Sequence, residues 1–259
     1  MEDFFYAGGL RGMLKRIDAY LDGGAKTVNG KTIGENIAKA MVYNDDIIRT
    51  VDNPIYHSGA LVVLRGNLAP DGCVMKVSAM DNRFLQHTGP ALVFDDYLAM
   101  KAAVNDENLD VTADHVMILR NAGPRGGPGM PEWGMLPVPI KLVKQGVRDM
   151  LRISDARMSG TSYGACVLHV APESYIGGPL GLVQTGDMIT INIKNRRIQM
   201  EVSDEELERR KAAWKPLPPR FERGYGWVFS RHIEQAPDGC DFDFMKTDFG
   251  APVSEPDIF

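Results

Sequence analysis

The chain of 259 residues has no long apolar run, no basic stretch and no block of like charge. No segment reaches the roughly 18 consecutive apolar residues of a membrane span, so we expect no membrane partner. The opening Met1-Glu-Asp-Phe-Phe-Tyr6 lacks the basic start of a signal peptide, and the expected location is therefore the cytoplasm. With 34 acidic and 29 basic side chains the formal charge is −5, which argues against nucleic acid as a partner.

Cysteine is also scarce. The three cysteines, Cys73, Cys166 and Cys240, are far apart and show no C-x-x-C spacing. Neither a disulfide framework nor a zinc site is indicated, and we expect each thiol to be a small buried hydrophobe. The five histidines show no metal-ligand spacing, and His169 is expected to be a half-buried strand residue. No glycine motif has the position that dinucleotide binding requires.

Helical patterns dominate the first fifty residues. Apolar residues at helical spacing predict a helix over residues 10–21, which Gly23 and Gly24 end. Thr32 and Glu35 form a capping box that predicts the start of a second helix. Residues 1–50 are therefore expected to form a helical segment.

From about residue 55 the pattern changes to short β-rich runs separated by turn-rich strings such as 66–72. Strands are expected at 60–65, 73–77, 91–94, 115–120, 151–153, 165–170, 187–193 and 197–202. Helices are expected at 96–104, 140–150 and 204–214, the last opened by a capping box of Ser203 and Glu206. The predicted fold class is α+β, with a β-barrel-like domain over residues 51–259 and an N-terminal helical appendage.

Two segments in the middle of the chain concentrate reactive side chains in backbone shaped by glycine. Residues 121–134 hold five glycines and three prolines, so they cannot form a helix or a central strand. This loop carries Arg125, Glu132 and Trp133. Residues 154–164 add further polar side chains: Asp155, Arg157, Ser159, Thr161 and Ser162.

The side chains of both segments can be interpreted as one cleft. Glu132 is a hard oxygen ligand suited to a magnesium-like ion, although a lone carboxylate equally suits a salt bridge or a loop cap. Ser159, at the expected tip of a turn, could act as a base beside a cation, or it could simply bond its own turn. Arg125 and Arg157 could clamp a substrate carboxylate or form structural ion pairs.

Several longer strings closely resemble the C-terminal half of the dihydroxy-acid and sugar-acid dehydratase family. The resemblance covers essentially the whole chain and rests on ordered motifs. These are Gly123-Pro-Arg-Gly-Gly-Pro-Gly-Met-Pro-Glu132, Ser154-Asp-Ala-Arg-Met-Ser-Gly160, Leu168-His-Val-Ala-Pro-Glu173 and Gly177-Gly-Pro-Leu180. The motif Ser154–Thr161 of this chain is more similar to the corresponding motif of pentonate and hexonate dehydratases than to that of the branched-chain biosynthetic enzymes. A sugar acid is therefore the expected substrate.

The resemblance implies a hydro-lyase that removes water from a 2,3-dihydroxy acid to give a 2-keto-3-deoxy acid. In this family an iron–sulfur cluster acts on the departing C3 hydroxyl, and Mg²⁺ holds the substrate carboxylate and C2 oxygen. By motif, Ser159 matches the base that removes the C2 proton, Glu132 matches a magnesium ligand, and Thr161 matches a neighbour of the substrate. The implied fold is the family's barrel-like swivelling domain, which resembles the mobile domain of the aconitases.

Complete members of the family are more than twice as long as this chain. Their cluster cysteines and remaining magnesium ligands lie in an N-terminal domain, to whose end residues 1–50 would belong. The chain is thus expected to be a C-terminal fragment or split gene product that alone binds no cluster and turns over no sugar acid. With the missing N-terminal domain or chain it would form the enzyme, expected as a homo-oligomer.

Three alternatives remain open. The chain could be part of a dihydroxy-acid dehydratase of branched-chain amino-acid biosynthesis, or a non-catalytic fragment that acts as a partner of a full-length dehydratase. The third, an unrelated serine hydrolase, would need a histidine and an acid beside Ser159.

Overall fold

The computed structural model describes residues 1–57 and 59–245, and residues 246–259 of the predicted barrel domain lie outside the described residues. The chain divides into two compact units, Met1–Gly59 and Ala60–Phe259. Within the described ranges, no helix combines the length and apolar character needed to cross a bilayer.

The first unit contains short helices joined by turns. α1 spans Glu2–Tyr6, α2 spans Gly9–Arg16, and α3 spans Ile33–Ile37, with a 3₁₀ turn at Asp18–Tyr20. The predicted capping box is confirmed. The Thr32 hydroxyl accepts a hydrogen bond from the backbone N–H of Glu35, and the Glu35 carboxylate accepts one from the backbone N–H of Thr32. The helix expected over 10–21 ends at Arg16, and turns make up much of the unit, so a helical appendage is not confirmed.

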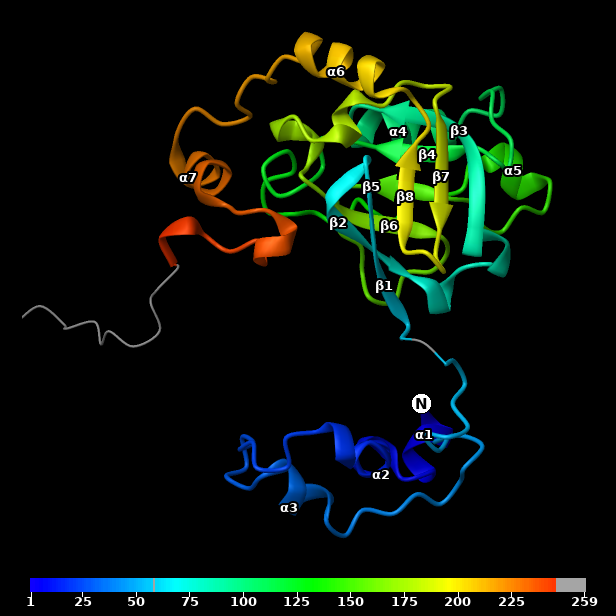
Figure 1. Cartoon of the computed structure of the whole chain (residues 1–259), viewed down its shortest axis with the longest axis vertical. Helices are drawn as coiled ribbons and strands as arrows, with labels where there is room; N and C mark the ends of the chain where they lie inside the picture. Colours follow the sequence, from blue (N-terminus) through cyan, green and yellow to red (C-terminus); the bar gives the residue numbers. More distant parts are fainter. Residues whose placement is uncertain (58, 246–259) are drawn as a thin grey trace, which may run out of the picture. The chain divides into compact units, whose positions relative to one another are not determined.

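The second unit is built on a closed barrel of eight strands in the described part of the chain, in the order β1-β2-β6-β5-β4-β3-β7-β8 (Figure 1). The prediction of a β-barrel-like domain is confirmed. The strands are β1 (Leu61–Gly66), β2 (Ala69–Lys76), β3 (Gln86–Phe94), β4 (Val116–Leu119), β5 (Arg152–Ser154), β6 (Cys166–Ala171), β7 (Met188–Asn192) and β8 (Arg197–Met200).

The barrel mixes parallel and antiparallel pairs. β3, β4, β5 and β6 run parallel to one another, and β8 closes the barrel against β1 in a parallel bridge. The remaining neighbours are antiparallel. All four residues of β4 are buried, as expected for a strand covered on both faces, and they belong to the main hydrophobic core.

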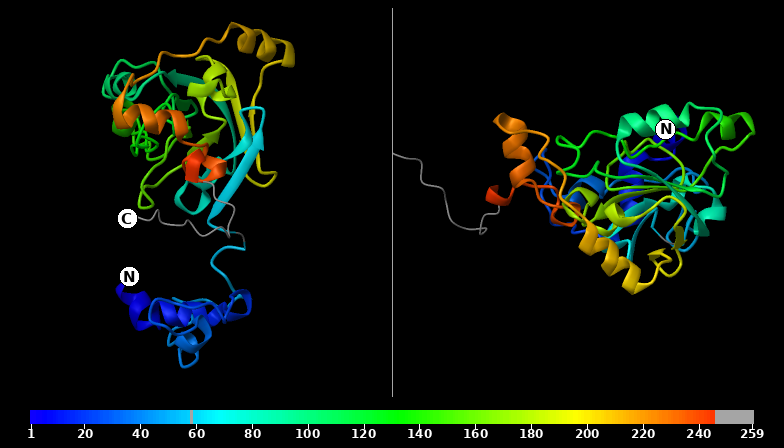
Figure 2. Two further views of the ribbon diagram at one scale, coloured as in Figure 1. Left: turned by 90° about the vertical axis from the view of Figure 1, so that its left-hand side faces the viewer. Right: turned by 90° about the horizontal axis from the view of Figure 1, so that it is seen from above.

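Helices lie on the outside of the barrel (Figure 2). α4 (Tyr97–Val104) begins where predicted, with Asp96 accepting from the backbone N–H of Ala99. α6 (Asp204–Ala213) also begins where predicted, and Ser203 accepts from the backbone N–H of Glu206. The Glu206 carboxylate instead binds the guanidinium groups of two neighbours, Arg209 and Arg210.

Two further predictions about elements are wrong, and one helix was not predicted. The helix expected over 140–150 is α5 (Ile140–Lys144) only, because Gly146 adopts a φ of 88°, the left-handed conformation that ends helices. β2 begins at Ala69, so the turn expected over 66–72 is much shorter. α7 (Gly224–His232) was not expected, because its two glycines weaken the helical pattern.

Candidate functional site

The carboxyl ends of the four parallel strands meet at one end of the barrel. The ladder aligns Phe94 of β3 with Leu119 of β4, and Leu119 with Ser154 of β5. The glycine-rich loop follows β4, the segment from Asp155 follows β5, and the segment from Pro172 follows β6. Because parallel strands end at the same edge, the motifs separated in sequence lie side by side in the fold.

Asp155 joins the loops that follow β4 and β6. Its buried carboxylate accepts hydrogen bonds from the backbone N–H of Ala122 (3.0 Å) and from the backbone N–H (2.9 Å) and hydroxyl of Ser174. Burial raises the pKa of Asp155, while these donors oppose the rise. The residue that precedes the proposed active-site turn therefore has a structural role.

Glu173 fixes the start of the glycine-rich loop. Its carboxylate is fully buried and accepts from the backbone N–H groups of Arg125 (2.9 Å) and Gly126 (3.0 Å) and from the amide of Gln235 (2.8 Å). Burial, and secondarily the charge of Asp155, raises the pKa of Glu173. The loop is thus shaped around a buried carboxylate that also binds the C-terminal segment.

Arg157 connects the two predicted segments directly. Its Nε donates to the carbonyl of Met130 (2.6 Å), and its Nη1 lies 3.6 Å from Oε1 of Glu132. Its own carbonyl accepts from the backbone N–H of Gly134 (2.7 Å). The Glu132 side chain remains 48% exposed, so this ion pair leaves its carboxylate accessible.

Trp133 holds the same loop from the other side. Its ring stacks on Tyr97 of α4, with centroids 5.2 Å apart and an interplanar angle of 13°. It also packs against the main core. Trp133 therefore anchors the loop, and the adjacent carboxylate of Glu132 projects from a fixed backbone.

Ser159 lies in a tight turn that bonds its hydroxyl. The Ser159 Oγ is 2.9 Å from the hydroxyl oxygen of Thr161 and accepts from the backbone N–H of Thr161 at 3.3 Å. The turn is closed by the backbone N–H of Ser162, which donates to the Ser159 carbonyl, and Lys76 Nζ donates to the carbonyl of Gly160 (2.8 Å). The Ser159 hydroxyl thus bonds within its own turn, and its role as a base stays a prediction.

The structure brings Arg157 and Glu132 into contact, and Ser159 is two residues beyond Arg157. Convergence of the Ser159 hydroxyl and the Glu132 carboxylate on one cavity stays a prediction. Arg125 Nε donates to the carbonyl of Ile233 (3.2 Å), and a clamp formed by Arg125 and Arg157 stays a prediction.

His169 of β6 is half-buried, as expected. Burial, with the nearby charge of Arg157, lowers its pKa, and its buried Nδ1 has no hydrogen-bond partner among the described residues. Among the described residues no Asp or Glu bonds this Nδ1, the contact that orients the histidine of a serine hydrolase.

Candidate metal ligands are sparse among the described residues. Across residues 1–57 and 59–245, no group of three or more His, Cys, Asp or Glu side chains could hold a metal ion. Burial raises the pKa of Cys73 to about 12 and that of Cys166 to about 11, so both thiols stay protonated and do not fit as cluster ligands. Glu132 does fit as a single accessible oxygen ligand.

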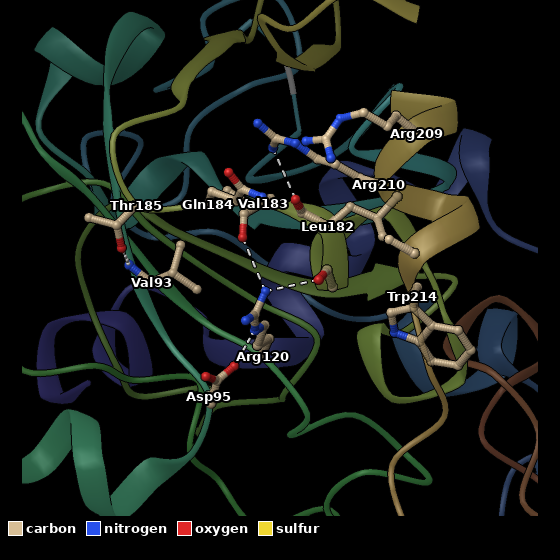
Figure 3. Close-up of a pocket in the computed structure, with 12 residues that line it drawn as sticks. Val93, Asp95, Arg120, Leu182, Val183, Gln184, Thr185, Arg209, Arg210 and Trp214 are labelled. Carbon is tan, nitrogen blue, oxygen red and sulfur yellow. Dashed lines mark hydrogen bonds and ion pairs between the residues drawn. The ribbon is translucent and has the colours of Figure 1, made fainter. Parts of the chain in front are cut away.

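A cavity of about 440 Å³ lies beside the ends of β3 and β4 (Figure 3). Its basic side chains already have partners. Arg120 bonds Asp95 and the carbonyl of Val183, and Arg210 bonds Asp187 and the carbonyl of Leu182. These contacts attach α6 and the 181–185 segment to the barrel, so this cavity is a structural junction.

Sequence reasoning did not assign roles to Glu173, Lys76 or Gln235. Two of them had a signal in the sequence. Glu173 lies three residues after a predicted strand, a position where functional side chains gather in parallel sheets. Lys76 lies near the end of another predicted strand, which the structure pairs antiparallel with both neighbours. Gln235 had none, because its contact depends on a segment 62 residues farther along the chain.

Residues 46–240 match the family model described as dihydroxy-acid/6-phosphogluconate dehydratase, C-terminal. The chain is 50% identical over 261 residues to a 6-deoxy-6-sulfo-D-gluconate dehydratase of Pseudomonas putida, covering 100% of this chain and 45% of that protein. It is 47% identical over 248 residues to an L-arabinonate dehydratase of Rhizobium leguminosarum bv. trifolii, covering 95% and 43%. A dihydroxy-acid dehydratase of Methanococcoides burtonii is 42% identical over 246 residues, covering 93% and 43%. The chain therefore spans less than half the length of these relatives.

Proposed function

Since the chain belongs to the dihydroxy-acid/6-phosphogluconate dehydratase family, we propose that it is the C-terminal part of a hydro-lyase that acts on a 2,3-dihydroxy sugar acid. The product would be the 2-keto-3-deoxy acid. The partner would be the N-terminal portion that the longer relatives have beyond the matched region. Residues 1–50 would belong to the end of that portion, residues 51–259 would form a swivelling domain like the mobile domain of the aconitases, and the complete enzyme would be a cytoplasmic homo-oligomer.

Ser159 is the proposed base for the C2 proton, and the bonding of its hydroxyl carries this proposal. The Ser159 Oγ accepts from the backbone N–H of Thr161 and shares a hydrogen bond with the Thr161 hydroxyl. Both donors would stabilise negative charge on Oγ, which a serine needs in order to act as a base. The ammonium of Lys76, bonded to the carbonyl of Gly160, adds a positive charge beside the turn.

Thr161 is the proposed neighbour of the substrate. Its side chain is exposed at the same turn, so it could contact a sugar hydroxyl while its backbone N–H remains bonded to Ser159. One short turn would then bind the substrate and hold the base in position.

Glu132 is the proposed magnesium ligand of this chain. The anchored Trp133 and the contact with Arg157 fix its backbone, while its carboxylate stays accessible. Bound Mg²⁺ would polarise the substrate carboxylate and so increase the acidity of the C2 proton. Its other protein ligands would come from the N-terminal portion.

The iron–sulfur cluster of the complete enzyme would also be held elsewhere. Cys73 and Cys166 are buried protonated thiols, which do not fit as ligands. We assign no step of the cluster's chemistry to residues of this chain.

A sugar acid is the preferred substrate over a branched-chain dihydroxy acid. Support comes from the segment Ser154–Thr161 and from identities of 50% and 47% to relatives named for gluconate- and arabinonate-type substrates, against 42% to a dihydroxy-acid dehydratase. The non-catalytic alternative, a partner of a full-length dehydratase, draws its support from the share of the relatives that the chain covers.

Reconstitution tests the proposal. The chain would be co-produced with the N-terminal portion of the Pseudomonas putida relative, loaded with Mg²⁺ and a cluster, and supplied with L-arabinonate, D-gluconate or 2,3-dihydroxyisovalerate. We expect 2-keto-3-deoxy acid from a sugar acid only when both parts are present. If 2,3-dihydroxyisovalerate is turned over and neither sugar acid is, the branched-chain alternative is favoured. A chain that copurifies with an intact dehydratase but never supports turnover would favour the non-catalytic one.

A further inference from the structure

A second cavity, of about 410 Å³, lies between the loop after β6, the linker after α6 and α7. Four aromatic rings and three arginines contribute to its walls, together with prolines and aliphatic side chains. The aromatic residues are Tyr175, Trp214, Phe221 and Trp227, and the arginines are Arg125, Arg220 and Arg231. A cavity of this volume is within the range that binds small organic ligands.

Close contacts fix three of the four aromatic side chains, namely Tyr175, Trp214 and Phe221. The Trp214 ring lies against Gly177, where an added Cβ would stand 3.2 Å from the ring. Phe221 lies against Gly226 in the same way, at 2.7 Å. The Tyr175 hydroxyl donates to the carbonyl of Pro218 (2.9 Å), which attaches the linker to the loop after β6. The cavity is therefore preformed.

The charge of the cavity is one-sided. No Asp or Glu is among the described residues that line it, although the whole chain carries a net charge of −5. The salt bridges found in the described ranges leave all three guanidinium groups without a carboxylate. Arg125 and Arg220 each donate to a backbone carbonyl, and Arg231 lies over the Trp227 ring at 5.5 Å.

We propose that this cavity binds a nucleoside monophosphate, or a similar flat ring that carries a phosphate. Flat rings stack on tryptophan faces, and guanidinium groups bind phosphate oxygens in pairs of hydrogen bonds. More than one arginine suits a dianionic phosphate better than a single carboxylate. Neither Ser159 nor Glu132 is among the described residues that line this cavity, so the inferred role is a regulatory or accessory one that goes beyond the proposed dehydration.

Titration of the chain with AMP tests the proposal, with binding followed by calorimetry and tryptophan fluorescence. We expect AMP to bind at micromolar concentration, and adenosine and inorganic phosphate each to bind at least tenfold more weakly. The Arg220→Ala/Arg231→Ala double variant should weaken AMP binding at least tenfold. The Lys194→Ala/Arg197→Ala double variant removes the same charge at exposed positions outside the cavity and should leave binding unchanged.

Trp227→Leu should also weaken AMP binding, whereas Trp227→Phe, which keeps an aromatic face, should retain most of it. Thermal unfolding of each variant separates a lost site from a lost fold. Absence of AMP binding at millimolar concentration, or equal weakening by both double variants, would overturn the proposal. Equal affinity for phosphate and AMP would overturn it as well, because the ring would then contribute nothing.

Discussion

Gly123 and Glu173 lie so close together that a Cβ on Gly123 would stand 2.6 Å from Oε2 of Glu173. The glycine-rich loop passes directly over a buried carboxylate and donates two backbone hydrogen bonds to it. At this position glycine is required by the close approach of the backbone to the carboxylate. The loop that carries Glu132 is thereby tied to β6 and the C-terminal segment.

Gly123→Ala should lower the free energy of unfolding by about 1–3 kcal/mol, because the new methyl group displaces the Glu173 carboxylate from its amide donors. Gly160→Ala is the matched control, since nothing lies within 4 Å of its added Cβ. Urea unfolding of both variants measures the difference. Equal stabilities would show that the loop can move away from Glu173 without cost.

Asp155→Asn should flatten the dependence of stability on pH. Burial raises the pKa of Asp155 in the folded state. The contribution of Asp155 to the free energy of unfolding is therefore fully present below its pKa in the unfolded chain, 3.8, and is lost as the pH rises through its pKa in the folded state. The stability of the wild type relative to Asp155→Asn should therefore fall as pH rises from about 4 to 8. Urea unfolding across this range measures it, and a relative stability that increases with pH would contradict the assignment.

Much of the barrel could be predicted because its signals are local. β4 is a short run of apolar residues, and Asp96 and Ser203 begin helices through bonds within one turn. The paired segments around Glu132 and Ser159 were also recognisable, because glycine and proline limit the conformations of the first and the turn residues mark the second.

What could not be predicted depends on contacts between distant residues. Glu173 binds Gln235 and Arg125, and neither pairing leaves a pattern in the sequence. α7 contains two glycines yet forms a helix, although glycine has a low helix propensity. α5 ends just before the left-handed Gly146, whose conformation the apolar spacing of the sequence does not indicate.

Arg210→Ala should destabilise the barrel by roughly 3 kcal/mol, because it leaves the Asp187 carboxylate, only 11% exposed, without its cation. The adjacent Arg209→Ala should have little effect, since the Arg209 side chain is 65% exposed where it binds Glu206. Thermal unfolding of the two variants makes the comparison. Similar losses would mean that charge on α6, not the contact with Asp187, attaches this helix.

Glu132→Gln should raise the Mg²⁺ concentration that gives half-maximal activity of the reconstituted enzyme by about tenfold or more, because a neutral amide is a weaker ligand than a carboxylate. Glu208→Gln, which removes a charge from the exposed face of α6, is the control and should leave the Mg²⁺ requirement unchanged. An unchanged requirement in Glu132→Gln would exclude this residue as a ligand.

Turnover of a sugar acid by the reconstituted enzyme carrying Ser159→Ala tests most directly whether this chain supplies the base. The control is Ser162→Ala, in the same turn, whose backbone N–H bond to Ser159 is kept. We predict that Ser159→Ala lowers kcat by about 10²–10⁴-fold with unchanged thermal stability, while Ser162→Ala retains activity. Turnover by Ser159→Ala at the wild-type rate would contradict the claim that this chain supplies the base.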